Sequence, residues 1–281
     1  MNILFRKLIR DLKEARGQFI ATLVIVVLGV MFYTGINATF RNLSGASEKY
    51  YREYRLADVF VSVFRAPESV LERVDSLDYV RMAAGRLVQD VKMDISGENA
   101  SLRVITLPDE KKDVVNDVML KSGRYFSDGE SSQCLVEEEF FKAHSLKTGD
   151  YIYPVINGTE VKLKVIGSVK SPEYVYPLKD GSELMPDSRK FGIIYVKESF
   201  GQAIFGYGGS INSVSVLLHQ GVDIKKAKDD LEKIFKDFGV IEIIERKDQL
   251  SNRMLTEEME GLKSSGSAFP IVFFIVSAVI I

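Results

Sequence analysis

The first long pattern in the chain is an apolar stretch that contains no charged residue. It covers residues 17–40 and lies between Arg16 and Arg41. As a helix it would be about 36 Å long, enough to cross a hydrocarbon core of about 30 Å with some tilt. The alternative, a buried helix of a soluble protein, usually keeps a polar face, and residues 19–32 have none. The pattern therefore predicts transmembrane helix 1 at residues 17–40.

A second uncharged stretch occupies residues 264–281, at the other end of the chain. Pro270 lies near its start, where a helix tolerates proline. We predict transmembrane helix 2 here. The last carbonyls of a span that stops in lipid would be unpaired, and natural proteins rarely end in this way. We therefore expect helix 2 to be truncated and the chain to be a fragment of a longer membrane protein.

The region between the spans has a β-α-β pattern at each of its ends. In the second pattern, Asp223 can cap an apolar helix face and Gly239 can end it. The predicted elements are strands at residues 57–64, from 79 onward, 211–218 and 240–245, with helices at residues 67–77 and 223–238. Two such units can form one ferredoxin-like sheet with its helices on one side.

The part between these two units is rich in strand patterns. Asn157-Gly158 within residues 155–169 is a hairpin signal, and residues 137–144 have a short helix pattern. We predict an α+β domain at residues 41–263. Its parts are a sheet subdomain from residues 41–112 and 201–246, an inserted β-rich subdomain at residues 113–200, and a helical return at residues 247–263. The predicted fold class is thus a membrane protein with an N-terminal transmembrane helix, this domain and the start of a second transmembrane helix.

Charge orients the first span. Residues 1–16 contain five cations and two acids, a net charge of +3, whereas the whole chain has −2. Short basic flanks stay in the cytoplasm, so we expect a multi-pass protein of the cell membrane with residues 1–16 inside and residues 41–263 extracytoplasmic. A cleaved signal peptide would have a shorter apolar core and small residues at its cleavage site. We therefore expect the first span to be retained as an anchor.

The cytoplasmic segment is itself patterned. Leu4, Leu8 and Leu12 share one face of a helix over residues 2–13, and the cations cover the other face. This pattern suits a helix that lies in the inner membrane interface with its cations on anionic headgroups. A soluble amphipathic helix packed on an ATPase or on another domain is the alternative.

Residues that carry chemistry are sparse. His144 and His219 lie far apart in the sequence, and no phosphate-binding G-x-x-x-x-G-K-[ST] motif is present. Cys134 is the sole cysteine, so it forms no intrachain disulfide, and we expect it to be buried. We predict no catalytic, cofactor-binding or metal-binding residue, no cofactor and no enzymatic activity. The acidic outside region also argues against nucleic acid as a partner.

Short motifs follow one another in order through the middle of the chain. They are Gly123-Arg124-Tyr125-Phe126, Gly129-Glu130, an apolar strand from Cys134, Leu146-Lys147-Thr148-Gly149-Asp150, Val165-Ile166-Gly167 and Ser171-Pro172-Glu173-Tyr174. This series between two spans resembles the extracytoplasmic core domain of the MacB/FtsX-like permeases of ABC transporters. Arg10-Asp11-Leu12 and the basic entry to the first span are also similar to that family. We expect structural roles for the glycines, such as a left-handed turn at Gly149.

The resemblance implies a permease subunit that couples a separate cytoplasmic ATPase to movement of the extracytoplasmic domain, for export, extrusion or mechanical signalling. It implies a dimeric permease in the lipid membrane and an ABC ATPase on a separate chain, with the contact segment outside this fragment. A two-span sensor, such as a receptor kinase or a chemoreceptor with an extracytoplasmic ligand-binding domain, has the same layout and is the alternative. A sensor would continue after residue 281 into a charged helical region, and a permease would continue into further apolar runs.

Overall fold

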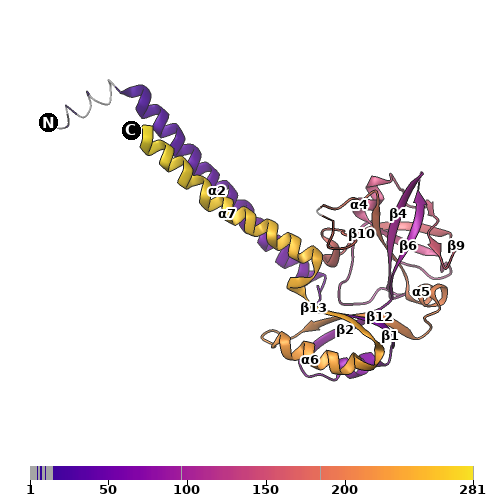
Figure 1. The fold of residues 1–281 in the computed structure, drawn as a ribbon. Coiled ribbons are helices and arrows are strands. Elements are labelled where there is room, and N and C mark those ends of the chain that lie inside the picture. Colours follow the sequence, from indigo (N-terminus) through magenta and orange to yellow (C-terminus); the bar gives the residue numbers. More distant parts are fainter. Residues whose placement is uncertain are drawn as a thin grey trace. The chain divides into compact units, whose positions relative to one another are not determined.

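The computed structural model describes residues 5, 7, 10, 15–95, 97–183 and 185–280 (Figure 1). Their contacts form two compact units. Unit 1 comprises the chain up to Lys49 and from Thr256 onward, and unit 2 comprises Tyr50–Leu255. The amphipathic helix predicted at residues 2–13 falls almost entirely outside the described residues.

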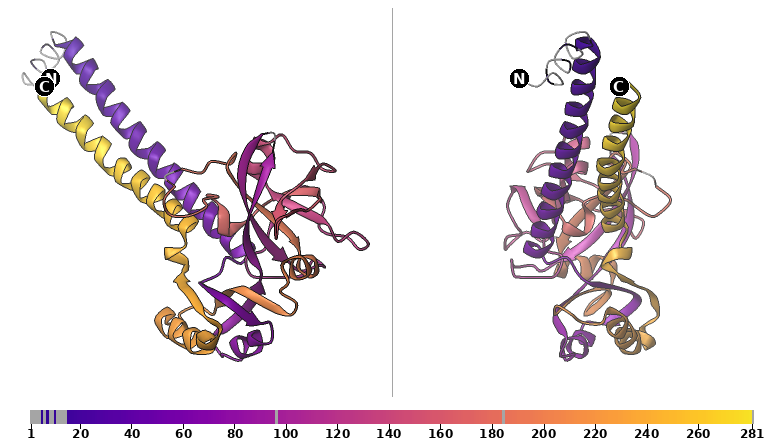
Figure 2. Two further views of the ribbon diagram at one scale, coloured as in Figure 1. Left: turned by 45° about the vertical axis from the view of Figure 1, so that its right-hand side comes forward. Right: turned by 90° about the vertical axis from the view of Figure 1, so that its left-hand side faces the viewer.

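Unit 1 consists of the larger parts of two long helices, α2 (Arg16–Glu53) and α7 (Leu250–Ile280), which run side by side in opposite directions (Figures 1 and 2). The ring of Phe32 on α2 stacks on that of Phe273 on α7, with centroids 5.6 Å apart. Gly29 leaves room for the Phe273 side chain, because a Cβ added to Gly29 would lie 3.1 Å from the Cβ of Phe273. Each helix is long and apolar enough to cross a membrane.

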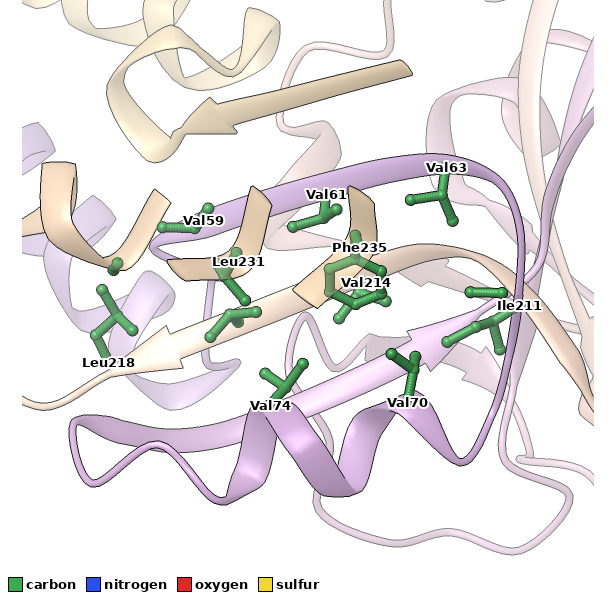
Figure 3. Packing of buried hydrophobic residues seen from close by; sticks show 13 residues of the cluster. Val59, Val61, Val63, Val70, Val74, Ile211, Val214, Leu218, Leu231 and Phe235 are labelled. Carbon is green, nitrogen blue, oxygen red and sulfur yellow. The ribbon is translucent and has the colours of Figure 1, made fainter. Parts of the chain in front are cut away.

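The first sheet of unit 2 joins the two β-α-β units, as predicted. Its antiparallel strands are β1 (Val59–Pro67), β2 (Val80–Arg86), β12 (Ser210–Leu218) and β13 (Val240–Glu245), in the order β13-β1-β12-β2. This is the ferredoxin-like arrangement. The helices α3 (Val70–Asp75) and α6 (Ile224–Phe235) pack on the same apolar core (Figure 3).

Alternation along the strands explains this core. Val59, Val61 and Val63 on β1 are buried with Leu231 and Phe235 of α6 (Figure 3). Successive side chains of a strand point to opposite faces, so one face of the sheet carries this valine row. The ends of α6 also follow the sequence. Asp223 accepts a hydrogen bond from the N–H of Lys225, and the chain leaves the 3-10 turn η2 (Lys236–Phe238) at Gly239, whose φ is +69°.

The second sheet of unit 2 has nine strands among the described residues. Eight follow the order β5-β10-β6-β11-β4-β3-β8-β9, and β7 pairs with β10. Two apolar cores accompany the sheet. The elements are β3 (Val88–Ile95), β4 (Glu98–Leu107), β5 (Met119–Gly123), β6 (Gln133–Glu137), α4 (Glu138–Ala143), β7 (Tyr151–Ile152), β8 (Val155–Ile156), β9 (Thr159–Glu160), β10 (Leu163–Lys170), the 3-10 turn η1 (Pro172–Tyr174), β11 (Phe191–Lys197) and α5 (Glu198–Phe205).

The subdomain boundary predicted at residue 112 is wrong. β3 and β4 belong to the second sheet, where β4 pairs with β11 in parallel from Ser101–Phe191 to Leu107–Lys197. The chain passes from the first sheet to the second at Leu87, which is buried between β2 and β3. The sequence around Leu87 has no proline and a single isolated glycine, Gly85, so the pattern does not separate β2 from β3.

The hairpin signal at Asn157-Gly158 corresponds to a shorter structure than residues 155–169. Asn157 and Gly158 join β8 to β9, with Ile156 opposite Thr159. Asn157 and Gly158 both have positive φ, as a tight hairpin turn requires. The longer strand β10 pairs instead with β5, β6 and β7.

Candidate functional site

The segment that follows α2 is bound to the loop between β4 and β5. The chain turns at Arg55, which has a φ of +55°, an uncommon conformation for a residue other than glycine. The carbonyl of Arg55 accepts a hydrogen bond from the N–H of Asn116 (2.9 Å), and that of Tyr54 accepts one from Asp117 (3.0 Å). The Arg55 guanidinium donates to the carbonyl of Val114 and pairs with Asp117 (3.1 Å). The segment just after α2, which we call the root of α2, is therefore fixed to residues 113–117.

Asn116 connects three parts of unit 2 and is only 1% exposed. Its side-chain Oδ1 accepts the N–H of Ala57 (2.7 Å), just after α2. Its Nδ2 donates to Glu173 in η1 (3.0 Å) and to Ser215 on β12 (3.0 Å). Every hydrogen-bonding atom of this amide can thus be assigned a role: one oxygen accepts and one nitrogen donates twice.

Arg86 and Glu173 form a buried ion pair between the two sheets. Arg86 ends β2 of the first sheet, and Glu173 follows β10 of the second. The two contacts, Nη1 to Oε2 and Nη2 to Oε1, are both 2.7 Å, and the side chains are 7% and 8% exposed. Burial alone would lower the pKa of Arg86, but the neighbouring Glu173 carboxylate outweighs burial and raises it. Arg86 is therefore a cation held by one carboxylate.

The first turn of α7 and the residue before it, Gln249, bind the segment that contains Glu173. Gln249 donates from Nε2 to the backbone carbonyl of Glu173 (2.7 Å) and accepts from the N–H of Asn252 in the first turn of α7 (2.8 Å). The N–H of Tyr176 donates to Ser251 Oγ (2.9 Å). The start of α7 is thus fixed to residues 173–176.

Arg246 lies shortly before α7 and binds the segment that follows α2 directly. Its Nε donates to the carbonyl of Ala57 (2.9 Å), its Nη2 donates to the carbonyl of Leu56, and the guanidinium pairs with Asp58 (2.8 Å). Leu56 and Ala57 are fully buried. We call Arg55, Arg86, Asn116, Glu173, Arg246 and Gln249 the root junction.

The root junction can hold parts of the chain together, but its groups suit no reaction. Its charged groups are paired with each other, with nearby aspartates or with backbone carbonyls, and it contains no cysteine, histidine or serine nucleophile. His144 lies elsewhere, where its Nε2 is 3.0 Å from the carbonyl of Arg189. Within the described residues no group of three or more histidine, cysteine or acidic side chains could hold a metal ion. Cys134 is fully buried, as predicted, and burial raises the pKa of its thiol.

The sequence contained only an indirect sign of this site. Ser171-Pro172-Glu173-Tyr174 belongs to the series of motifs, but nothing in it gave Glu173 a role. Asn116 and Arg86 lie in no motif. Their importance depends on partners that are far away in the sequence: Glu173 is 57 residues from Asn116 and 87 from Arg86.

Comparison with models of protein families identifies one family. The family model described as MacB-like periplasmic core domain matches residues 19–234. No curated protein matches the chain. Among solved structures, the periplasmic region of MacB from Actinobacillus actinomycetemcomitans is 14% identical, with a TM-score of 0.44 and coverage of 75% of this chain and 95% of that one.

Two further solved structures are similar to parts of this chain. The extracellular domain of the noncanonic ABC-type transporter YknZ from Gram-positive bacteria is 14% identical, with a TM-score of 0.44 and coverage of 66% of this chain and 99% of that one. A domain of a putative permease protein from Porphyromonas gingivalis is 12% identical, with a TM-score of 0.39 and coverage of 65% and 84%.

Proposed function

Because this chain belongs to the family of the MacB-like periplasmic core domain, we propose that it is the part of an ABC transporter permease that moves outside the membrane when a separate cytoplasmic ATPase changes state. In this proposal α2 and α7 cross the cell membrane, residues 1–16 are cytoplasmic and residues 41–263 are extracytoplasmic. Two such permease subunits act together. The segment that touches the ATPase lies outside residues 1–281.

The root junction is the observation that supports this proposal. The segments next to the two long helices are linked through a pair of hydrogen-bonded residues, since Asn116 binds both Ala57 and Glu173, and Gln249 binds Glu173. Arg86 carries this connection into β2 of the first sheet. A displacement of either root would therefore act on both sheets of unit 2, because buried hydrogen bonds and a buried ion pair are costly to break.

Hydrogen exchange in the full-length permease, purified in nanodiscs with its co-purified ATPase, tests this function. Addition of ATP and vanadate should change the exchange of the backbone amides in residues 113–117, 171–176 and 246–252. The core helix α4 serves as the internal control and should keep its exchange rate. In the Arg246→Met variant ATP hydrolysis should continue, whereas the response in residues 113–117 should be lost.

Two results would count against the proposal. In the first, no ATPase that hydrolyses ATP co-purifies with the chain. This is the result expected of a two-span sensor. The other is an identical exchange pattern of unit 2 with and without nucleotide in an active complex.

A further inference from the structure

Unit 2 contains a groove along the outer edge of β2. The groove has a volume of about 270 Å³, and residues 82–86, five in a row, line it. Successive side chains of a strand point to opposite faces, so a cavity on one face of the sheet would be lined by alternate residues only. The unbroken run therefore places the groove at the edge of the strand. β2 is the last strand in the order β13-β1-β12-β2, so this edge is unpaired among the described residues.

The backbone of β2 directs hydrogen-bonding groups into this groove. Just after β2, the N–H of Leu87 donates to Thr106 Oγ1 (2.9 Å) and its carbonyl accepts from the N–H of Thr106 (3.0 Å). Thr106 lines the groove, so the backbone groups of Leu87 lie on its side of the strand. Alternate residues of a strand direct these groups to the same side, so Gly85 and Ala83 do so too. The Ala83 N–H binds the Asp75 carboxylate, which leaves the Ala83 carbonyl and both groups of Gly85 for an added strand.

The groove is acidic. It shares Glu68, Pro108, Lys112 and Glu198 with a neighbouring cavity of about 370 Å³, so the two form one surface. Two of the charged groups on this surface already have a partner, since Arg86 pairs with Glu173 and Asp113 pairs with Arg55. The others are four acids and one lysine, a net charge of −3: Glu68, Asp109, Glu110, Glu198 and Lys112.

These acids lie close enough to affect one another. Burial raises the pKa of Glu198, and the carboxylates of Glu68 and Asp109 raise it further, against the opposite effect of Lys112. Like charges held near each other are unfavourable, so a cation that enters the groove relieves their repulsion. The groove thus combines an unpaired strand edge with a charge that selects a basic partner.

We infer that this groove binds an extended, basic peptide segment of a partner protein, which adds a strand to β2. The backbone of the segment bonds to Gly85 and Ala83, and its lysine or arginine side chains lie against the acids. In strand addition the backbone gives affinity and the side chains give specificity. The other wall of the groove contains Asp113 and Val114, which bind Arg55 at the root of α2. The inference concerns unit 2 alone and holds whether or not an ATPase drives the chain.

Calorimetric titration of the full chain in phosphatidylcholine nanodiscs tests the inference, because this zwitterionic lipid has no net charge to attract a basic peptide. The probe is an acetylated, amidated pentapeptide in which lysine and valine alternate. One control peptide has glutamate in place of lysine. The other is N-methylated at every peptide bond, so it keeps its charge but has no backbone donor.

The lysine peptide should bind saturably, at least ten-fold more tightly than either control peptide. Absence of saturable binding would overturn the inference. Equal affinity for the N-methylated peptide would exclude strand addition, and equal affinity for the glutamate peptide would exclude selection by charge, so either result would refute it.

Variants and hydrogen exchange then locate the site. Glu68→Lys should weaken binding of the lysine peptide at least five-fold. Glu72→Lys makes the same change of charge at an exposed position of α3 that lines neither cavity, so it should change the affinity less than two-fold. Bound peptide should slow hydrogen exchange in residues 80–87 and leave α4 unchanged. Equal weakening by the two variants, or unchanged exchange in residues 80–87 at saturation, would place the peptide elsewhere and refute the assignment.

Discussion

Arg86 and Glu173 face each other in a two-contact ion pair that closes a loop of 87 residues and joins the two sheets of unit 2. Neither side chain is more than 8% exposed, so each charge depends on the other. Asn116 donates a further hydrogen bond to the same carboxylate. The most directly testable property of the root junction is therefore the coupling between these residues.

We expect Glu173→Ala to lower the free energy of unfolding of the full chain by about 3–5 kcal/mol, because it leaves the Arg86 cation buried without a partner. Replacement of both residues by methionine should cost less than the sum of the costs of Arg86→Met and Glu173→Met made singly, since no buried charge remains. Denaturant unfolding in detergent micelles measures all four variants. Strictly additive losses would show that the pair is not coupled.

Leu231→Ala tests the core of the first sheet. Leu231 is fully buried against the β1 valines, and its truncation should cost about 2–5 kcal/mol. Lys225→Ala on the same helix is the matched control, since Lys225 is exposed and its replacement should change stability by less than about 0.5 kcal/mol. Similar melting temperatures for the two variants would contradict the packing in Figure 3.

Alanine substitutions at Gly123 and Gly149 distinguish the cost of a steric clash from the cost of a left-handed backbone conformation. Both have positive φ, at +76° and +102°. A Cβ on Gly123 would lie 2.6 Å from the Cα of Gly167, whereas a Cβ on Gly149 would meet nothing within 4 Å. We expect Gly149→Ala to cost about 1–2 kcal/mol for the left-handed backbone alone and Gly123→Ala about 1–3 kcal/mol more for the clash. If the two variants lost the same free energy of unfolding, β5 and β10 would have to move apart easily to make room for the Cβ at position 123.

Glu137 should make stability depend on pH. Its carboxylate accepts the N–H groups of Glu139 and Phe140 at the start of α4, but burial raises its pKa overall. A carboxyl with a raised folded-state pKa binds its proton more tightly in the folded protein. Its contribution to stability is therefore largest at low pH and falls as pH rises from the unfolded-state value of about 4.3 through the raised pKa.

Unfolding of Glu137→Gln from pH 4 to pH 7 isolates this group. The stability of the variant relative to the wild-type chain should rise across this range, because glutamine cannot ionise. Glu72→Gln on α3, an exposed position, provides the control and should not reproduce the trend. A difference between Glu137→Gln and wild type that is independent of pH would exclude Glu137 as the titrating group.

Cysteine labelling in intact cells tests the proposed orientation of the first span. In a Cys134→Ser background, an impermeant thiol reagent should label Lys49→Cys, whereas Lys13→Cys should react only after the cells are permeabilised, because basic flanks stay inside. Cys134 itself is a minor background even in the wild-type chain, since it is buried and burial raises the pKa of its thiol. The reverse labelling pattern would invert the topology.

The sequence alone determined the features that depend on neighbouring residues. Length and lack of charge predicted the two long apolar helices, and alternation with capping residues predicted both β-α-β units, including Asp223 and Gly239 at the ends of α6. A helix or a strand buries a face that its own periodicity defines. These elements can therefore be predicted from the sequence without knowledge of their partners.

The tertiary structure decided what those elements touch. Alternation in β3 and β4 shows that they are strands but does not select their sheet, and the crossing at Leu87 lies within a continuous strand-like pattern. The root junction depends even more on the fold, because Ala57, Asn116 and Glu173 meet only through strand register and two residues with positive φ, Arg55 and Asn116. A polar side chain in a loop has the same local pattern whether it faces water or a buried partner, so only the packed chain identifies which of them join the two helices.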